Sequence, residues 1–500
     1  MTAGSRLVRP MFVYGLGEAA TRFLSLLLLP LFTAYLTPAD YGVLSILGVL
    51  AMVATPVFSL GLGASLGVCY FEVGADPARH HGATVWTSFA LLVASCSVLA
   101  LLAVVFAAPV SRLAFGTPEE ARAVSLLSLS TCFSILRTPF MLRLQFDQRA
   151  RTYAVITAVS SLATIGLSLL FVVALHRGVL GMVEGWLIAN AVVLVLVLLV
   201  AARGLRARLD AAVGRELLRL GIPLVPSFAS LFVLQQANKS ILQGIRGLEA
   251  VGIYTIGLNL GMVAGLAVSG FAYAWHPFFL SYADRRNEAA VLFGRVLTFY
   301  VLGFGALGLV FFLTARAVVM VMTQAPFRAA YQIVGLSATS QILIGVFSIL
   351  LAGMYFDREV KYQSIIQGVA AAVAVALNFV AIHLLGTVGA ALALALGYLA
   401  MAVLQHLWNR HRGYLAVRYE WGRILRFSLV YVAIAAVAIW PRQLPLALEL
   451  TSSVVGVLLV PPLIWVFLRP DERSFVRTRL AALRWRRGWA PATDTAGGHE

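Results

Sequence analysis

The sequence predicts an all-α polytopic membrane protein with about fourteen transmembrane helices. Of its 500 residues, 61% are hydrophobic and only 12% are charged, whereas about 25% are charged in an ordinary soluble domain. One transmembrane helix takes about 20 apolar residues, so a chain of this composition supplies about a dozen spans. The spacing of Cys69, Cys96 and Cys132 fits neither a disulfide framework nor a zinc site. The composition therefore excludes a soluble enzyme, a disordered chain and a disulfide scaffold.

Apolar segments follow one another along the chain with short connections. Arg6 and Arg9 precede the first segment, but it contains Glu18 and Arg22 and is too long for a signal-peptide core, so we expect it to be retained as a span. The fourteen segments lie near residues 11–35, 41–68, 84–108, 122–142, 153–175, 179–201, 218–243, 250–275, 290–314, 329–355, 363–384, 387–408, 424–441 and 450–468.

The basic residues are divided unequally between the two sides of these spans. With the N-terminus in the cytoplasm, the inside segments hold 28 of the 38 Lys and Arg residues and the outside loops hold 7. Cytoplasmic loops of membrane proteins collect basic residues, so both termini are expected in the cytoplasm. This bias also accounts for the net charge of +17, and no nucleic-acid partner is expected.

A short internal repeat indicates two lobes. Residues 42–46 (Gly-Val-Leu-Ser-Ile) align with residues 252–256 (Gly-Ile-Tyr-Thr-Ile) at an offset of 210 residues. Each copy holds six spans and both begin on the same side, so their axis would run along the membrane normal beside a shared cavity. The expected units are an N-terminal lobe at 1–202, a basic interfacial connector at 203–217, a C-terminal lobe at 218–408, two further spans at 409–468 and a basic cytoplasmic tail at 469–500.

Two inside segments have the pattern of interfacial helices. From residue 203 to 220, leucine and valine recur at helical spacing between arginines. From Phe475 to Trp489, tryptophans and other apolar residues alternate with arginines, a pattern that suits the anionic lipids of the inner leaflet. The alternative for this tail is a solvated segment that only enforces the topology.

Three basic residues lie within spans, where charge usually faces a cavity or a partner. Arg22 lies near the bilayer centre, and Glu18 precedes it at the spacing that allows an ion pair. The two residues therefore form either a neutral structural pair or a cavity wall in which Arg22 meets an anionic substrate. Arg137 either lines the same cavity or extends to the inner surface.

The third basic residue belongs to an unusually polar stretch of span seven. Residues 235–239 (Gln-Gln-Ala-Asn-Lys) are too polar to face lipid on every side, so we expect Gln235, Asn238 and Lys239 to line the cavity. The alternative is that Lys239 extends to the outer surface. No hydrolase triad, phosphate-binding loop or metal cluster is evident, so we predict no catalytic, cofactor-binding or metal-binding residue and no enzymatic activity.

Three stretches resemble the polysaccharide flippases of the multidrug/oligosaccharidyl-lipid/polysaccharide exporter superfamily. The first comprises residues 15–17, 29–33 and 35–42, which end in Tyr-Leu-Thr-Pro-Ala-Asp-Tyr-Gly. The second runs from Asn238 to Tyr254, and the third is Ala-Trp-His-Pro at 274–277. The family usually has an Asp-Arg pair where this chain has Asn238 and Lys239, so the cation is kept and the acid is lost.

The resemblance implies two six-helix lobes around a central cavity, with two extra C-terminal helices that line a groove for a polyprenyl tail. It implies alternating-access movement of an undecaprenyl-diphosphate-linked oligosaccharide across the bacterial inner membrane, for O-antigen, capsule or exopolysaccharide synthesis. Arg22, Arg137 and Lys239 would pair with the diphosphate. The expected partners are a polysaccharide polymerase and glycosyltransferases, together with the anionic lipids that the basic inside segments suit. No cofactor is implied, and a coupling ion, H+ or Na+, stays open.

Two other functions compete with this one. Drug exporters of the same superfamily typically have twelve spans and cavities suited to organic cations, whereas three cations within spans favour an anionic substrate. Membrane glycosyltransferases and polysaccharide polymerases generally carry catalytic residues in a large extramembrane loop. The loop around Glu119 and Glu120 is among the longest here and is too small for that purpose.

Overall fold

The computed structural model describes residues 27–71, 77–225, 227–357, 359, 361–440, 445–474 and 477. These residues form helices and no strand. Ten helices in this part of the chain are long and apolar enough to cross a membrane, or eleven if one bent pair counts as a single span. The polytopic all-α prediction is confirmed. The count of fourteen stays a prediction, because most of the first span lies outside the described residues.

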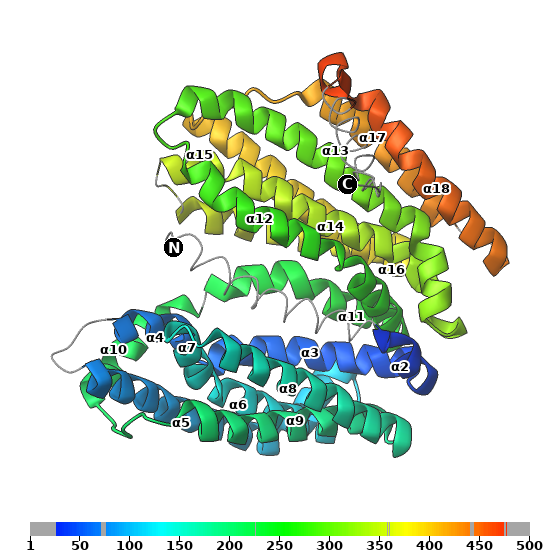
Figure 1. Cartoon of the computed structure of the whole chain (residues 1–500). Helices are drawn as coiled ribbons and strands as arrows, with labels where there is room; N and C mark the ends of the chain where they lie inside the picture. Colours follow the sequence, from blue (N-terminus) through cyan, green and yellow to red (C-terminus); the bar gives the residue numbers. More distant parts are fainter. Residues whose placement is uncertain are drawn as a thin grey trace, which may run out of the picture.

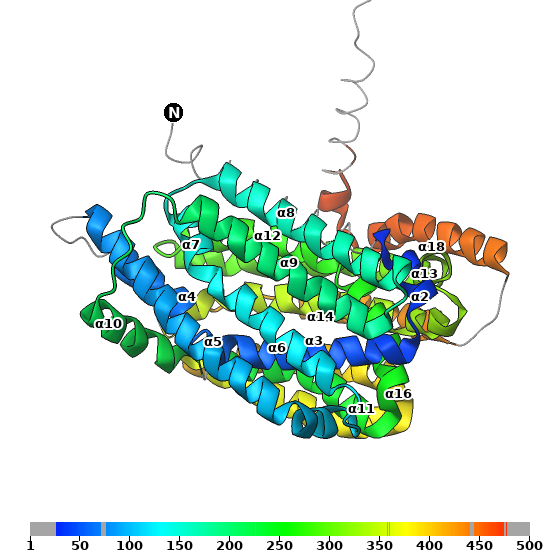
Figure 2. The same ribbon diagram turned by 90° about the horizontal axis from the view of Figure 1, so that it is seen from below.

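The N-terminal half is a bundle of helices joined by short turns. Within it, α6 packs against α5 and α9, while α8 packs against α9, and Figure 2 shows these helices running side by side. Its elements are α2 (Leu29–Tyr35), α3 (Pro38–Phe58), α4 (Leu62–Phe71), α5 (Pro77–Phe115), α6 (Ala121–Leu136), α7 (Thr138–Phe146), α8 (Ala150–Leu169), the π-helix η1 (Leu170–Ala174) and α9 (Gly178–Ala201).

The C-terminal half forms a second bundle, in which α14 packs between α13 and α16. α17 and α18 lie against α13 on its far side (Figure 1). Its elements are α11 (Ser227–Gly261), α12 (Ala264–Leu280), α13 (Arg286–Met322), the 3-10 helix η3 (Ala325–Ala330), α14 (Tyr331–Leu350), α15 (Ala352–Phe356), α16 (Lys361–Arg412), α17 (Trp421–Ile439) and α18 (Leu446–Phe467).

Two long assigned elements of the C-terminal bundle, α11 and α16, are hairpins rather than straight helices. α16 breaks at Gly386, whose φ of 59° lies in the left-handed region. A Cβ on Gly389 would lie 1.9 Å from the carbonyl oxygen of Ala381, although eight residues of straight helix span about 12 Å. α11 breaks likewise at Gly247, where φ is 83°. α16 therefore covers the two expected spans at 363–384 and 387–408, whereas α11 covers the seventh span and only the first part of the eighth, which continues in α12 after a bend of 45°. In both elements the chain reverses at a glycine because the backbone there needs a positive φ.

The connections fall into two groups at opposite ends of the bundles, as the arginine count predicts. At one end, Nη2 of Arg246 donates to the carbonyl of His383 at 2.8 Å, which joins two connections assigned to the outside. At the other end, Nη2 of Arg286 lies 2.9 Å from the carboxylate of Asp357, which joins two connections assigned to the inside. We call these the outer end and the inner end.

The connector between the halves contains a shorter helix than the sequence predicts. α10 (Ala211–Gly221) begins only after Asp210, whose carboxylate accepts from the backbone N–H of Ala212 at 2.9 Å. Gly204 has a φ of 78°, which breaks any helix before that cap. α10 packs against α4 and α5, and a Cβ on Gly221 would lie 2.5 Å from the carbonyl oxygen of Leu60. The connector is therefore fixed to the N-terminal bundle at its inner end. The expected tail helix from Phe475 to Trp489 lies almost entirely outside the described residues.

Candidate functional site

The two bundles meet where α3 crosses α11 at the outer end. α3 begins there because Thr37 caps it and forms a capping box with Asp40, while Pro38 occupies the first turn. A Cβ on Gly42 would lie 2.0 Å from the carbonyl oxygen of Leu248 in α11. A Cβ on Gly252 would lie 1.8 Å from the carbonyl oxygen of Pro38. Only glycine permits this approach of the two backbones, and we call the contact the outer seam.

The outer seam has the geometry of a two-fold axis between the repeats. Gly42 contacts Leu248 and Gly252 contacts Pro38, and both glycines and both partners are 210 residues apart in sequence. Such reciprocal contacts mark an isologous interface. The equivalent residues Ser45 and Thr255 hydrogen-bond to each other at 2.8 Å, which places them at the axis. The repeat seen in the sequence therefore forms the junction between the bundles.

The seam closes the outer end, and the face of α3 becomes more exposed toward its inner end. Ile46 is buried in the main hydrophobic cluster of the C-terminal bundle, and the side-chain amide of Gln243 on α11 donates to the carbonyl of Ala114 at the end of α5. Farther along α3, Val53 and Val57 are 45% and 46% exposed. In Figure 1 the two bundles converge at the end where α2 and α11 meet and diverge toward α10 and α15. This arrangement faces inward.

The polar stretch of α11 lies directly behind this seam. Asn238 is 1% exposed, and its amide donates to the hydroxyl of Tyr254, so its side chain joins the two arms of the hairpin. Gln235 is exposed and hydrogen-bonds to Tyr398 of α16. Lys239 is half-buried, and within the described ranges no carboxylate pairs with it. The stretch thus places a cation beside a polar hairpin core.

Arg137 lies in the other bundle, at the break between α6 and α7. Its Nη1 donates to the hydroxyl of Ser160 on α8 at 3.0 Å, and its side chain is half-buried. The structure therefore places Arg137 and Lys239 in separate bundles. The expected pair of Glu18 and Arg22 lies outside the described residues.

Other arginines that the sequence analysis assigned to loops are buried in ion pairs. Arg143 was expected in an inside connection, but it is buried in α7, with its Nε 3.2 Å from the carboxylate of Asp147. Arg316 was expected in an outside loop, but it is buried near the end of α13, 3.3 Å from Glu449 of α18. These expectations were wrong because helices continue past the apolar segments that defined the spans. Their charges are neutralised by acidic partners and serve packing.

A further ion-pair network anchors α17 and α18 at the inner end. Nη2 of Arg423 lies 2.5 Å from Glu472, which also accepts from the backbone N–H of Arg469 at 2.8 Å. Partial burial opposes ionisation of Glu472, but the hydrogen bonds from Arg423 and Arg469 outweigh it and hold the pKa of that carboxyl below its ordinary value of 4.5. The charged form is therefore the one that the fold stabilises.

This network predicts an acid-sensitive anchor. Because the folded pKa of Glu472 lies below the unfolded one, its stabilisation is complete above pH 4.5 and is lost as the pH falls through the folded value. We expect the melting temperature of the detergent-solubilised protein to fall more between about pH 5 and pH 3 in the wild type than in Glu472→Gln. Equal acid sensitivity in the two proteins would contradict this role of Glu472.

Comparison with known proteins identifies the family. A model of the polysaccharide biosynthesis protein family matches residues 7–283. The chain belongs to this family. No curated protein sequence matches the chain.

The fold of this polysaccharide biosynthesis protein is shared with solved transporters. An inward-facing multidrug resistance MATE family transporter of the MOP superfamily superposes with a TM-score of 0.63 at 16% identity, over 82% of this chain and 98% of that one. The lipid II flippase MurJ in an inward closed conformation gives 0.61 at 14% identity, over 92% and 99%. An outward-facing MATE transporter gives 0.52 at 17% identity, over 82% and 94%. At these identities the likeness concerns the fold.

Proposed function

We propose that this polysaccharide biosynthesis protein flips an undecaprenyl-diphosphate-linked oligosaccharide repeat unit from the inner to the outer leaflet of the bacterial inner membrane. The observation that carries the proposal is the outer seam, which joins two repeat-related bundles at one end while their inner ends diverge. Such a junction permits the bundles to rock about it, which is the motion of alternating access. The family match to polysaccharide biosynthesis supports a substrate from that pathway.

The charges within the membrane support an anionic substrate. A diphosphate that leaves water needs compensating positive charge, since an unpaired buried charge is costly. Lys239 carries such a charge on α11, whereas the buried acids Glu184 and Glu449 are each paired with arginine. Arg22, in the first span of the other lobe, is proposed as a second cation for the diphosphate, with Arg137 as a third. The coupling ion would be H+ or Na+.

Export of surface polysaccharide tests this assignment. Lys239→Ala is expected to lower export at least about tenfold at an unchanged protein level, because each 1.4 kcal/mol of lost charge pairing changes an equilibrium by that factor. Lys361→Ala is the matched control, because Lys361 is exposed at the start of α16 with its ammonium over the ring of Tyr362. Full export by an Arg22→Ala, Lys239→Ala double variant at normal abundance would overturn the cationic pathway.

Substitutions at Glu18 and Arg22 distinguish the roles that these two residues could have in the proposed transport. Arg22→Lys should be partly tolerated if only charge matters, and poorly tolerated if the guanidinium makes a bidentate phosphate contact. Glu18→Gln should reduce stability more than export if Glu18 only neutralises Arg22. Loss of export in a normally abundant Glu18→Gln protein would instead assign a proton-coupling role to that carboxyl.

A drug exporter is the second candidate, because a MATE family transporter fits the fold as well as the lipid II flippase does. An ammonium beside the α11 hairpin would repel an organic cation. Increased resistance of cells to cationic drugs when the protein is overproduced, with no change in surface polysaccharide, would favour this candidate.

The glycosyltransferases and the polymerase of the polysaccharide pathway are the proposed partners of the flippase, and anionic lipids are proposed to bind its basic inner surface.

A further inference from the structure

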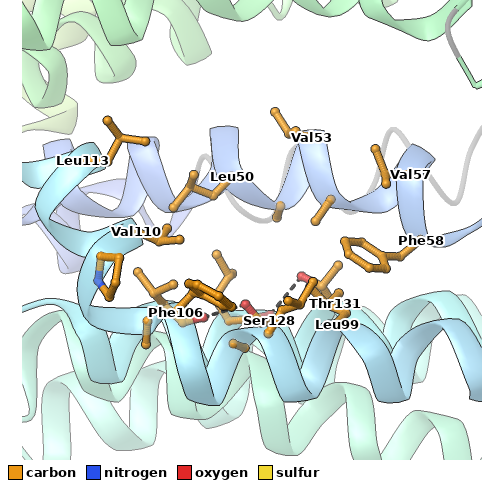
Figure 3. Close-up of a pocket in the computed structure, with 18 residues that line it drawn as sticks. Leu50, Val53, Val57, Phe58, Leu99, Phe106, Val110, Leu113, Ser128 and Thr131 are labelled. Carbon is orange, nitrogen blue, oxygen red and sulfur yellow. Dashed lines mark hydrogen bonds between the residues drawn. The ribbon is translucent and has the colours of Figure 1, made fainter.

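An apolar cavity of about 530 Å³ lies inside the N-terminal bundle, between α3, α5 and α6. In Figure 3, Leu50 and Phe58 of α3 and Phe106 of α5 lie around it, with Ser128 and Thr131 of α6 on its floor. Both floor hydroxyls donate to carbonyls of their own helix, at 2.8 Å each. The cavity therefore offers an apolar surface without an unpaired hydroxyl, and it suits a hydrocarbon chain rather than a polar ligand.

The cavity is continuous with the outer seam. Along α3, Ile46 is buried in the C-terminal bundle, and Leu50, Val53 and Val57 follow it four, seven and eleven residues later on the same face of the helix. These three residues line the cavity. The stripe of α3 that the other bundle covers at the seam thus becomes a cavity wall where the two bundles diverge.

The second wall also begins at the seam. Val110 and Leu113 of α5 line the cavity, and the next residue, Ala114, accepts the hydrogen bond from Gln243 across the seam. Leu113 is 90% exposed, so this wall is open at its edge. An occupant of the cavity would extend from the seam onto the membrane-facing side of α5, where Leu101 and Val105 are also exposed.

We propose that this cavity binds the polyprenyl chain of the carrier lipid during transport. The inference rests on the proposed function, because the chain must stay in an apolar environment while its diphosphate passes between the lobes. A water molecule takes up about 30 Å³ in the liquid, and a carbon group of the chain is of similar size. A cavity of about 530 Å³ therefore holds roughly fifteen to twenty carbon groups. Only a segment of the polyprenyl chain is held, and the rest stays in the bilayer.

Photolabelling of the full-length protein in phosphatidylethanolamine and phosphatidylglycerol vesicles tests the site. The probe is undecaprenyl phosphate with a diazirine in its chain. We expect label on peptides of α3, α5 and α6 that line the cavity, with competition by unlabelled undecaprenyl phosphate. Phosphatidylglycerol with the same diazirine in an acyl chain should label these peptides weakly. Equal labelling by both probes without competition would show ordinary lipid contact and overturn the proposal.

Two variants sharpen the test. Ala107→Phe fills the cavity from a buried wall position, and Val57→Trp narrows it from an exposed one, so that at least one is expected to fold. Both should lower labelling by the polyprenyl probe about tenfold, whereas Val195→Trp, at a 56% exposed position on α9 of the same bundle, should not. Undiminished labelling in both cavity variants would overturn the site.

The probe carries no sugar and need not cross the membrane, so labelling tests the polyprenyl site independently of the proposed flippase function. Specific labelling by a protein that exports no polysaccharide would leave the site and overturn the flippase proposal. Normal export by a protein whose cavity is not labelled would overturn the site alone.

Discussion

Gly252→Val is expected to abolish polysaccharide export while the protein remains in the membrane. A Cβ at this position would lie 1.8 Å from the carbonyl oxygen of Pro38 and 3.0 Å from the backbone nitrogen of Gly42. Backbone atoms on both sides would have to separate by more than 1 Å to relieve the clash. Overpacking of this kind typically costs about 1–3 kcal/mol or more, which is enough to depopulate the closed outer seam by about tenfold or more.

The chain offers matched controls for this substitution. Gly48 lies on α3 and Gly244 on α11, close to the seam glycines, yet a Cβ on either would meet nothing within 4 Å. Gly48→Val and Gly244→Val should therefore support near-normal export, whereas Gly42→Val should behave like Gly252→Val. A crosslink between cysteines at Ser45 and Thr255 reports the seam directly, because their hydroxyls are 2.8 Å apart. Normal export with an intact crosslink in Gly252→Val would contradict the assigned role of the seam.

Glu449→Gln is expected to destabilise the protein by about 3–5 kcal/mol, the usual cost of removing one partner of a buried ion pair. Glu449 is 1% exposed, and its carboxylate lies 3.3 Å from Nη1 of Arg316. Arg316 also donates to the carbonyl of Trp440 at 3.0 Å and lies over the ring of Tyr331, 4.1 Å from its centroid. A neutral amide would remove the carboxylate charge that lies 3.3 Å from the buried guanidinium.

Thermal unfolding in detergent measures this effect, with Glu288→Gln as the control. Glu288 lies at the other end of α13 in an exposed pair with Arg285 at 3.6 Å, and exposed pairs contribute about 0–1 kcal/mol. Replacement of both buried partners, Arg316→Met with Glu449→Leu, should recover most of the lost stability. If Glu449→Gln proved as stable as Glu288→Gln, the buried pair would not anchor α18 to α13.

The polytopic fold and the relative positions of the connections were predictable because they depend on composition and on the distribution of arginine. The repeat at residues 42 and 252 was also visible, since one offset relates both copies. The contact between the two copies was not, because a glycine on an apolar helix indicates close packing without identifying its partner. Only the structure shows that Gly42 and Gly252 face each other's repeats.

The candidate site was less predictable than the fold, for physical reasons. Hydropathy cannot separate a loop arginine from one neutralised by a distant acid, so the pairing of Arg316 with Glu449, 133 residues later, was missed. Glu449, an acid at the edge of the apolar segment at 450–468, was the available signal. Asn238 was expected to face the cavity, yet it bonds to Tyr254, because the reversal at Gly247 brings the two arms of α11 together.

Transport by the purified protein tests the central claim most directly. The protein is reconstituted into vesicles with fluorescent undecaprenyl-diphosphate oligosaccharide in the inner leaflet, and the fraction that becomes accessible to a membrane-impermeant quencher outside is followed over time. The account predicts rapid exposure with the wild type and with Gly48→Val, and exposure no faster than in protein-free vesicles with Gly252→Val. The account would be contradicted if the wild-type protein, inserted in either orientation, exposed the fluorescent lipid to the quencher no faster than protein-free vesicles do.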